Sequence, residues 1–446
     1  MNPGLLLPLI TALPGAAFLF LALCWMLGIV LREKHVTRLT SSVFLLASAG
    51  VTVLAFTSGP VKADLGSLFT AGRYQFPVVL VLDRLSLPLV GLTILLTGLI
   101  GAFSARYLHR EPGFLRFFLL LHLFAFGSLL LFTAGSLDLV VAGWELVGLT
   151  SVLLIAFFQE RADPVRSALR VFAMYRAADI GLLVGVFTVH HSFGTASFAG
   201  LFTGAWPDQS TRIGGGEALL VGLLLVLAAA GKSAQAPFTS WLPRAMEGPT
   251  PSSAVFYGAI SVHAGAYLLL RMQPVIAASW TASILVIAMG VTTAVIGTLA
   301  GRACSDIKTS LAHASMTQVG IIFAEIGLGL PTLALWHICG HAAARTLQFL
   351  RAPSALHEFH QMHSAAGGHL EQTGVHLEAI VPVRFRNWLY RLALDRGHVD
   401  AILDRLFASP LYRAGVFLQR WCGAGLQSEG RLKPPPCGHL SGELDA

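Results

Sequence analysis

The chain has 446 residues, of which 55% are hydrophobic and only 12% are charged, and its mean hydropathy is +0.70. Soluble domains carry about 25% charged residues, so this composition excludes a soluble globular protein and indicates an all-α polytopic membrane protein. The net charge of +7 needs no nucleic-acid partner, because lysine and arginine on cytoplasmic loops give the same sign. The five cysteines show no CxxC spacing, so we expect neither a disulfide framework nor a metal site.

Apolar segments recur along the chain and predict about eleven transmembrane helices. They cover residues 4–31, 39–58, 78–105, 114–134, 137–158, 167–190, 217–241, 252–271, 279–301, 307–329 and 332–350. The first segment lacks a basic start and a small-residue cleavage site, so we interpret it as a membrane span rather than a signal peptide. Lysine and arginine concentrate in alternate loops, which predicts an external amino terminus and a cytoplasmic tail.

Three regions follow from this pattern. Residues 1–75 hold the first two helices, 76–350 form the main transmembrane domain, and 351–446 form a cytoplasmic tail. The tail mixes apolar and basic residues over 380–425, which predicts an amphipathic helix at the inner membrane surface or against a partner. Residues 430–446 are predicted to be disordered. The tail histidines from His357 to His376 favour an exposed polar helix over a metal cluster.

The seventh segment carries a charge and a helix breaker where hydrocarbon is expected. Lys232 follows an apolar run, and Pro237 lacks the N–H that an α-helix requires, so the helix must kink or break there. A broken helix is tolerated in a membrane only where it is packed in protein or lines a watery cavity. One alternative is that Lys232 snorkels to the surface. We favour burial and a role in ion transfer, because a central lysine costs about 3 kcal/mol.

Two further segments place ionisable residues inside apolar spans. Glu145 lies in Gly143-Trp144-Glu145-Leu146-Val147-Gly148. If Glu145 pairs with Lys232, both side chains would stay charged. The alternative is that Glu145 is a neutral acid bonded to a backbone carbonyl. Arg176 and Asp179 are three residues apart on one helix face. They either pair with each other or tune the Glu145–Lys232 pair.

Later segments carry polar residues suited to proton transfer. The eighth holds Tyr257 and His263, and the eleventh holds His337, His341 and Arg345, which the spacing of four places on one helix face. Aligned buried histidines favour a proton relay over isolated hydrogen bonds. Lys308, at the start of the tenth segment, either belongs to this path or faces water beside Asp306.

Several motifs together resemble one known family. They are Gly231-Lys232-Ser233-Ala234-Gln235, Trp241-Leu242-Pro243, Ala245-Met246-Glu247-Gly248-Pro249-Thr250-Pro251, the Gly143–Gly148 stretch, Asp306-Ile307-Lys308, and His337-x3-His341. The chain resembles the antiporter-like subunits of respiratory complex I, most closely the NuoL type, and their MrpA-type relatives, over about residues 75–350.

The resemblance implies that Glu145 and Lys232 form a charge pair beside a water-filled path, and that His337 and His341 extend a buried polar axis. Tyr257 stands where the family has its helix 8 histidine, and His263, six residues later, is expected to replace it. Arg345 stands where a lysine is usual. Arginine does not release a proton in proteins, so its role is expected to be electrostatic.

We therefore expect a proton-translocating membrane subunit that is not itself a redox enzyme and holds no cofactor. The partners implied are other membrane subunits of a complex I-like assembly in a bacterial inner membrane. The short tail also suits the DabB type, the membrane half of an inorganic-carbon transporter whose partner is a cytoplasmic, zinc-containing subunit resembling carbonic anhydrase. A cation/H⁺ antiporter and a non-conducting scaffold are the remaining alternatives.

Overall fold

The computed structural model describes residues 3–56, 59–71, 74–304, 306–365 and 381–394, with isolated positions at 405, 409–410, 413–418 and 420. Side chains at 71, 74, 257, 259 and 353–365 are not described. Contacts group Met1–Asp400 into one unit and Ala401–Ala446 into a second. The predicted disordered end, 430–446, lies outside the described residues.

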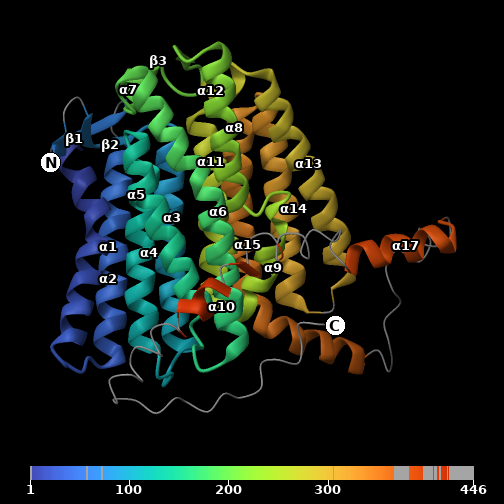
Figure 1. Ribbon diagram of the computed structural model, residues 1–446. Helices are drawn as coiled ribbons and strands as arrows, with labels where there is room; N and C mark the ends of the chain where they lie inside the picture. Colours follow the sequence, from blue (N-terminus) through green and yellow to red (C-terminus); the bar gives the residue numbers. More distant parts are fainter. Residues whose placement is uncertain are drawn as a thin grey trace. The chain divides into compact units, whose positions relative to one another are not determined.

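The first unit is a bundle of helices that run roughly alongside one another (Figure 1). The longer ones are α1 (Pro3–Met26), α2 (Glu33–Ala55), α3 (Ser86–Tyr107), α4 (Phe114–Thr133), α5 (Leu137–Ile155), α6 (Ala162–Phe193), α8 (Gly215–Lys232), α13 (Trp280–Ala303), α14 (Ile307–Gly327) and α15 (Pro331–Ala365). Among the described residues, nine helical stretches are long and apolar enough to cross a membrane. The prediction of a mostly helical, polytopic membrane fold is confirmed, and the two remaining predicted segments, 307–329 and 332–350, coincide with α14 and α15.

Two short hairpins depart from the all-α prediction. Strands β1 (Val61–Ala71) and β2 (Tyr74–Leu82) pair antiparallel, with Val61 opposite Leu82. The third predicted helix was therefore placed too early, because residues 78–82 are β-branched and aliphatic and belong to β2. The second hairpin joins β3 (Phe202–Thr203) to β4 (Ser210–Thr211) after the short helix α7 (Phe198–Leu201).

The helix break predicted near Pro237 is present and longer than expected. Helix α8 ends at Lys232, and the chain continues through the short turns η1 (Phe238–Ser240), α9 (Trp241–Arg244) and η2 (Ala245–Glu247). Ala234 has a φ of 52°, a left-handed conformation that costs a non-glycine residue about 1–2 kcal/mol. The indole of Trp241 donates to the carbonyl of Gly231 at 2.9 Å, which holds the break together.

The eighth predicted span is also irregular, which the sequence did not indicate. It consists of α10 (Thr250–Ser253), the π-turn η3 (Ala254–Ala259), the 3₁₀ turn η4 (Ser261–His263) and α11 (Ala264–Arg271), followed by α12 (Gln273–Ala277). A Cβ atom added at Gly258 would lie 2.9 Å from the backbone nitrogen of Thr346, so α15 packs directly on this backbone. The π-turn widens the helix at the point where the two backbones meet.

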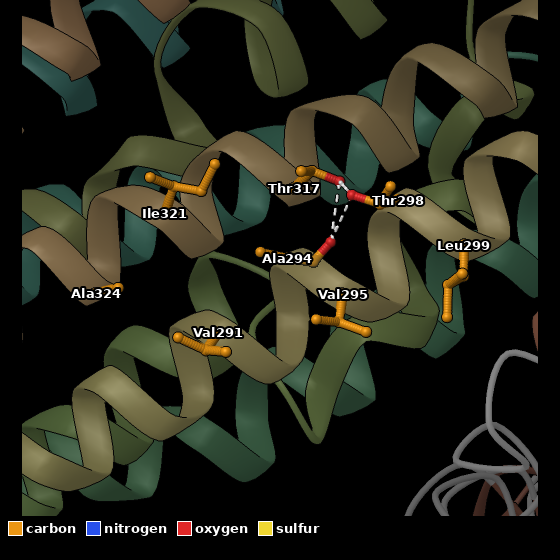
Figure 2. Close-up of a pocket in the computed structure, with 8 residues that line it drawn as sticks. All are labelled: Val291, Ala294, Val295, Thr298, Leu299, Thr317, Ile321 and Ala324. Atoms are coloured by element: carbon orange, nitrogen blue, oxygen red, sulfur yellow. Dashed lines mark hydrogen bonds between the residues drawn. The ribbon is translucent and has the colours of Figure 1, made fainter. Parts of the chain in front are cut away.

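Helices α13 and α14 pack closely through facing glycines. A Cβ added at Gly290 would lie 2.4 Å from the carbonyl oxygen of Gly320, and one added at Gly320 would lie 2.6 Å from that of Gly290. Small residues allow such approach between membrane helices. A groove of about 480 Å³ runs between the same two helices (Figure 2). Its eight lining residues include no titratable side chain, so we do not assign it to an ion path.

The boundary predicted at residue 350 falls within α15, which continues to Ala365. Within the predicted amphipathic stretch, the structure describes one helix, α17 (Val383–Leu394). The tail histidines lie outside the residues whose side chains are described.

A buried ion pair ties the end of α11 to the start of α3. Arg271 donates to both carboxylate oxygens of Asp83, at 2.5 and 3.2 Å, and lies over the ring of Tyr267. Asp83 also accepts from the backbone nitrogens of Leu85 and Ser86, at 3.1 and 2.9 Å. Burial acts to raise the pKa of Asp83, but the charge and hydrogen bond of Arg271 and the hydrogen bonds from Ser86 outweigh it, so the pKa is lowered.

Replacing Asp83 with asparagine is expected to destabilise the protein by about 3 kcal/mol, because it leaves the buried charge of Arg271 unpaired. A carboxyl whose pKa is lowered by folding stabilises the fold above its unfolded pKa of about 4, and the stabilisation is lost as the pH falls through the lower folded value. In the wild type, the ionised Asp83 should therefore still stabilise the fold at neutral pH.

Thermal unfolding of the detergent-solubilised protein measures the effect. The control is Asp64→Asn on exposed β1, which should change stability by less than about 0.5 kcal/mol. Equal stability of the Asp83 and Asp64 variants would contradict the assignment.

Candidate proton pathway

The first polar cluster surrounds Lys232, at the carboxyl end of α8. The side chain is 1% exposed, and its Nζ donates to the carbonyl of Trp144 at 2.9 Å. The same Nζ lies 4.9 Å from the ring centre of Trp144 and 4.6 Å from that of Tyr175. Aromatic faces and a carbonyl are partners suited to an ammonium group. The helix break places this charge in the protein interior rather than at the surface.

The carboxylates of the cluster gather around Arg176 on α6. Its Nη2 lies 2.5 Å from Glu145 Oε2 and 2.6 Å from Asp179 Oδ2. The indole of Trp144 donates to the other oxygen of Asp179 at 2.5 Å. Trp144 therefore links the two halves of the cluster, accepting from Lys232 through its backbone and donating to Asp179 through its side chain.

The direct contact predicted between Glu145 and Lys232 is not formed, and this part of the prediction was wrong. The carboxylate of Glu145 contacts Arg176 instead, because the arginine side chain extends across the α5–α6 interface. Lys232 is satisfied by Trp144 and the two aromatic rings. The four charged residues still form one cluster, in which Arg176 lies between the acids.

The second cluster joins η4 to α15. His263 Nε2 and His341 Nδ1 lie 2.8 Å apart, and both side chains are buried. A hydrogen bond at this distance places the two imidazoles in direct proton-transfer contact. The Tyr257 side chain is not described, so its predicted role stays a prediction. His263, expected to replace the usual histidine, lies against His341.

Two serine side chains, Ser151 and Ser261, lie between the Lys232 cluster and the histidine pair. Ser151 follows Gly148 by one turn of α5, and its hydroxyl lies 3.4 Å from that of Ser261, two residues before His263. Within the described part of the chain, buried atoms that make no hydrogen bond include the hydroxyls of Tyr175 and Ser233 and Nε2 of His341. Ordered water satisfies such atoms in proteins.

The other two predicted residues of α15, His337 and Arg345, bond to partners on α14 and on α15 itself. His337 bonds to Glu325 and to Gln318, both at 2.9 Å. Arg345 donates to Gln348 at 2.6 Å. A cavity of about 290 Å³ is lined by His337, His341, Arg345, Gln318, Gln348, Gly340 and Ala344. The predicted face of His337, His341 and Arg345 therefore borders one cavity.

Lys308 lies apart from these clusters, at the first turn of α14. Its Nζ donates to the carbonyls of Met246 and Gly248, at 2.8 and 3.0 Å, and so holds the turns that follow the helix break. Among the described residues, no group of three metal-ligating side chains is present.

Sequence reasoning did not assign Gln318 or Trp144 a role, and left Glu325 open. A signal for the α14 pair was present: Gln318 and Glu325 are seven residues apart, so they share a helix face within an apolar span.

The fold and the site together define a polytopic membrane protein with a broken helix, a buried lysine and two contacting buried histidines. A family model described as NADH:quinone oxidoreductase/Mrp antiporter, transmembrane, matches residues 134–373, and one described as NADH-ubiquinone oxidoreductase (complex I), chain 5 N-terminus, matches residues 68–118. The chain belongs to this NADH:quinone oxidoreductase/Mrp antiporter family. Both clusters lie within the longer match.

Individual relatives agree with the family. NADH-quinone oxidoreductase subunit L of Mycobacterium tuberculosis is 38% identical over 293 residues, which cover 65% of this chain and 46% of the relative. NADH-ubiquinone oxidoreductase chain 5 of Neurospora crassa is 33% identical over 325 residues, 72% of this chain and 45% of the relative. The chain thus spans about half the length of the curated relatives it matches.

The fold agrees with a solved structure as well. A chain of the Mrp complex from Dietzia sp. DQ12-45-1b superposes with a TM-score of 0.67 at 26% identity, over 78% of this chain and 37% of that chain.

Proposed function

We propose that the chain is a proton-translocating membrane subunit of a complex I-type assembly, in which H⁺ moves between the Lys232 cluster and the histidines of η4 and α15. The observation that carries the proposal is the direct contact of His263 with His341, at 2.8 Å, in the interior of a chain that also buries Lys232. The two relatives described above are named NADH-quinone oxidoreductase subunit L and NADH-ubiquinone oxidoreductase chain 5.

The cluster geometry suggests how a charge change would be passed on. Arg176 keeps its proton, so it serves as a fixed positive charge held by two acids. A change in the charge or position of Glu145 alters the forces on Arg176 and Asp179, and through Trp144 on Lys232. The lysine then exchanges its proton with the polar groups leading to His263 and His341. Arg345 and the Glu325–His337 pair set the electrostatic field around His341, at the end of the pathway away from Lys232.

The event that shifts Glu145 is assigned to partner subunits. The sequence shows no nucleotide-, flavin- or iron–sulfur-binding motif, so the chain is proposed to work with other membrane subunits of a redox-driven assembly. We place the chain in a bacterial inner membrane, and the charge bias of the loops favours an orientation with the amino terminus outside and the tail in the cytoplasm.

Proton movement into membrane vesicles, driven by the native assembly, tests the proposal. Lys232→Ala and Glu145→Gln should each reduce pH-dye quenching to background, whereas Lys62→Ala, on exposed β1, should leave it unchanged. All vesicles should hold equal amounts of folded assembly. Full proton movement in both the Lys232 and Glu145 variants would refute the proposal.

The structural match to an Mrp complex favours a second candidate, a cation/H⁺ antiporter subunit. In that case the pH change would depend on Na⁺ or K⁺ and would persist without a redox substrate. A DabB-type carbon transporter is the third candidate. It predicts that a zinc-containing cytoplasmic subunit copurifies with the chain.

A further inference from the structure

The exposed helix α17 is amphipathic, and the proton pathway does not use it. At 100° per residue, one face carries only apolar side chains, and the opposite face carries Asn387 and Tyr390 together with the terminal residues Val383 and Leu394. The apolar face consists of Phe385, Trp388, Leu389, Leu392 and Ala393. Arg384 and Arg391 border it on one edge, and Arg386 borders it on the other.

Two aromatic residues of this face are exposed and contact each other. Phe385 is 52% exposed, Trp388 is 55% exposed, and their ring centres lie 5.6 Å apart. Among the twelve residues of α17, only Ala393 is buried. Exposed aromatic residues next to arginines are typical of helices that lie at the boundary between lipid headgroups and acyl chains.

The placement of α17 agrees with such a boundary. The helix packs against α13, a membrane-spanning helix, and runs across the direction of the spanning helices (Figure 1). A helix that lies in the membrane plane has this orientation. The charge of its polar edge is wholly positive, because no acidic residue occurs between Val383 and Leu394.

We propose that α17 binds the headgroups of anionic phospholipids and holds the start of the tail to the membrane surface. Arg384, Arg386 and Arg391 contact lipid phosphates, while Phe385 and Trp388 insert between the acyl chains below them. This inference does not depend on the proposed transport function.

Hydrogen–deuterium exchange of the full chain in nanodiscs tests the proposal. Discs of phosphatidylcholine alone are compared with discs that also contain phosphatidylglycerol. Exchange across residues 383–394 should slow by about fivefold or more in the anionic discs, the effect expected of a single arginine near an anionic surface. Added salt should reduce the difference. Peptides from α13 and α14 should exchange equally in both discs.

The Arg384→Gln/Arg386→Gln/Arg391→Gln variant should lose the lipid-dependent difference, since glutamine keeps the helix and removes the charge. The matched control is Lys62→Gln on β1, which should keep the difference in full. Equal exchange of α17 in both discs would overturn the proposal. So would a difference that persists in the triple variant, or protection that appears only when a partner protein is bound.

Discussion

Replacing Gly148 with alanine is expected to lower proton transport by roughly ten- to hundredfold while leaving the bundle folded. A Cβ added at this position would lie 2.8 Å from Nζ of Lys232. The atom that must move is the end of a flexible side chain, so the ammonium is displaced rather than the backbone. It then loses its bond to the Trp144 carbonyl. A hydrogen bond to a charged group contributes about 1.5–3 kcal/mol, which corresponds to the stated loss of rate.

The matched control is Gly185→Ala on α6. A Cβ there meets the side chains of Leu224 and Leu225 at 3.6 Å, an ordinary van der Waals distance. Both variants should unfold at temperatures close to that of the wild type, and only the Gly148 variant should lose transport in the vesicle assay. Wild-type transport by the Gly148 variant would show that the position of the ammonium does not matter.

The features that could be predicted from the sequence are those with a local cause. Lys232 within an apolar run, with Pro237 after it, predicted a broken membrane helix, because a charge in hydrocarbon and a missing N–H each act within a few residues. The spacing of His337 and His341 placed both on one face for the same reason. Each of these features is present in the structure.

The features that could not be predicted depend on how helices pack. Glu145 contacts Arg176 rather than Lys232 because α6 brings the guanidinium to the carboxylate, and sequence spacing does not give distances between helices. The π-turn at Ala254–Ala259 likewise arises where the backbone of α15 meets Gly258. The partners of His337 on α14 follow from the same packing.

The contact between His263 and His341 predicts a specific pattern in a double-mutant experiment. His263→Ala and His341→Ala should each lower proton transport by about a hundredfold, the lower end of the loss expected when an acid–base group is removed. The double variant should be no slower than either single variant, because both changes interrupt the same transfer step and such effects are not additive.

The control for this cycle is His122→Ala. His122 is also a buried histidine, but it lies on α4, contacts Thr40 at 3.1 Å and stacks on Phe44. The His122→Ala variant should be destabilised about as much as the other two single variants. Its rate of proton transport per folded molecule should equal that of the wild type. Losses at His263 and His341 that multiply in the double variant would mean that the two imidazoles act in separate steps, and the 2.8 Å contact would then be structural. Losses that match across all three variants would trace the effect to packing, since removal of any buried ring leaves a cavity.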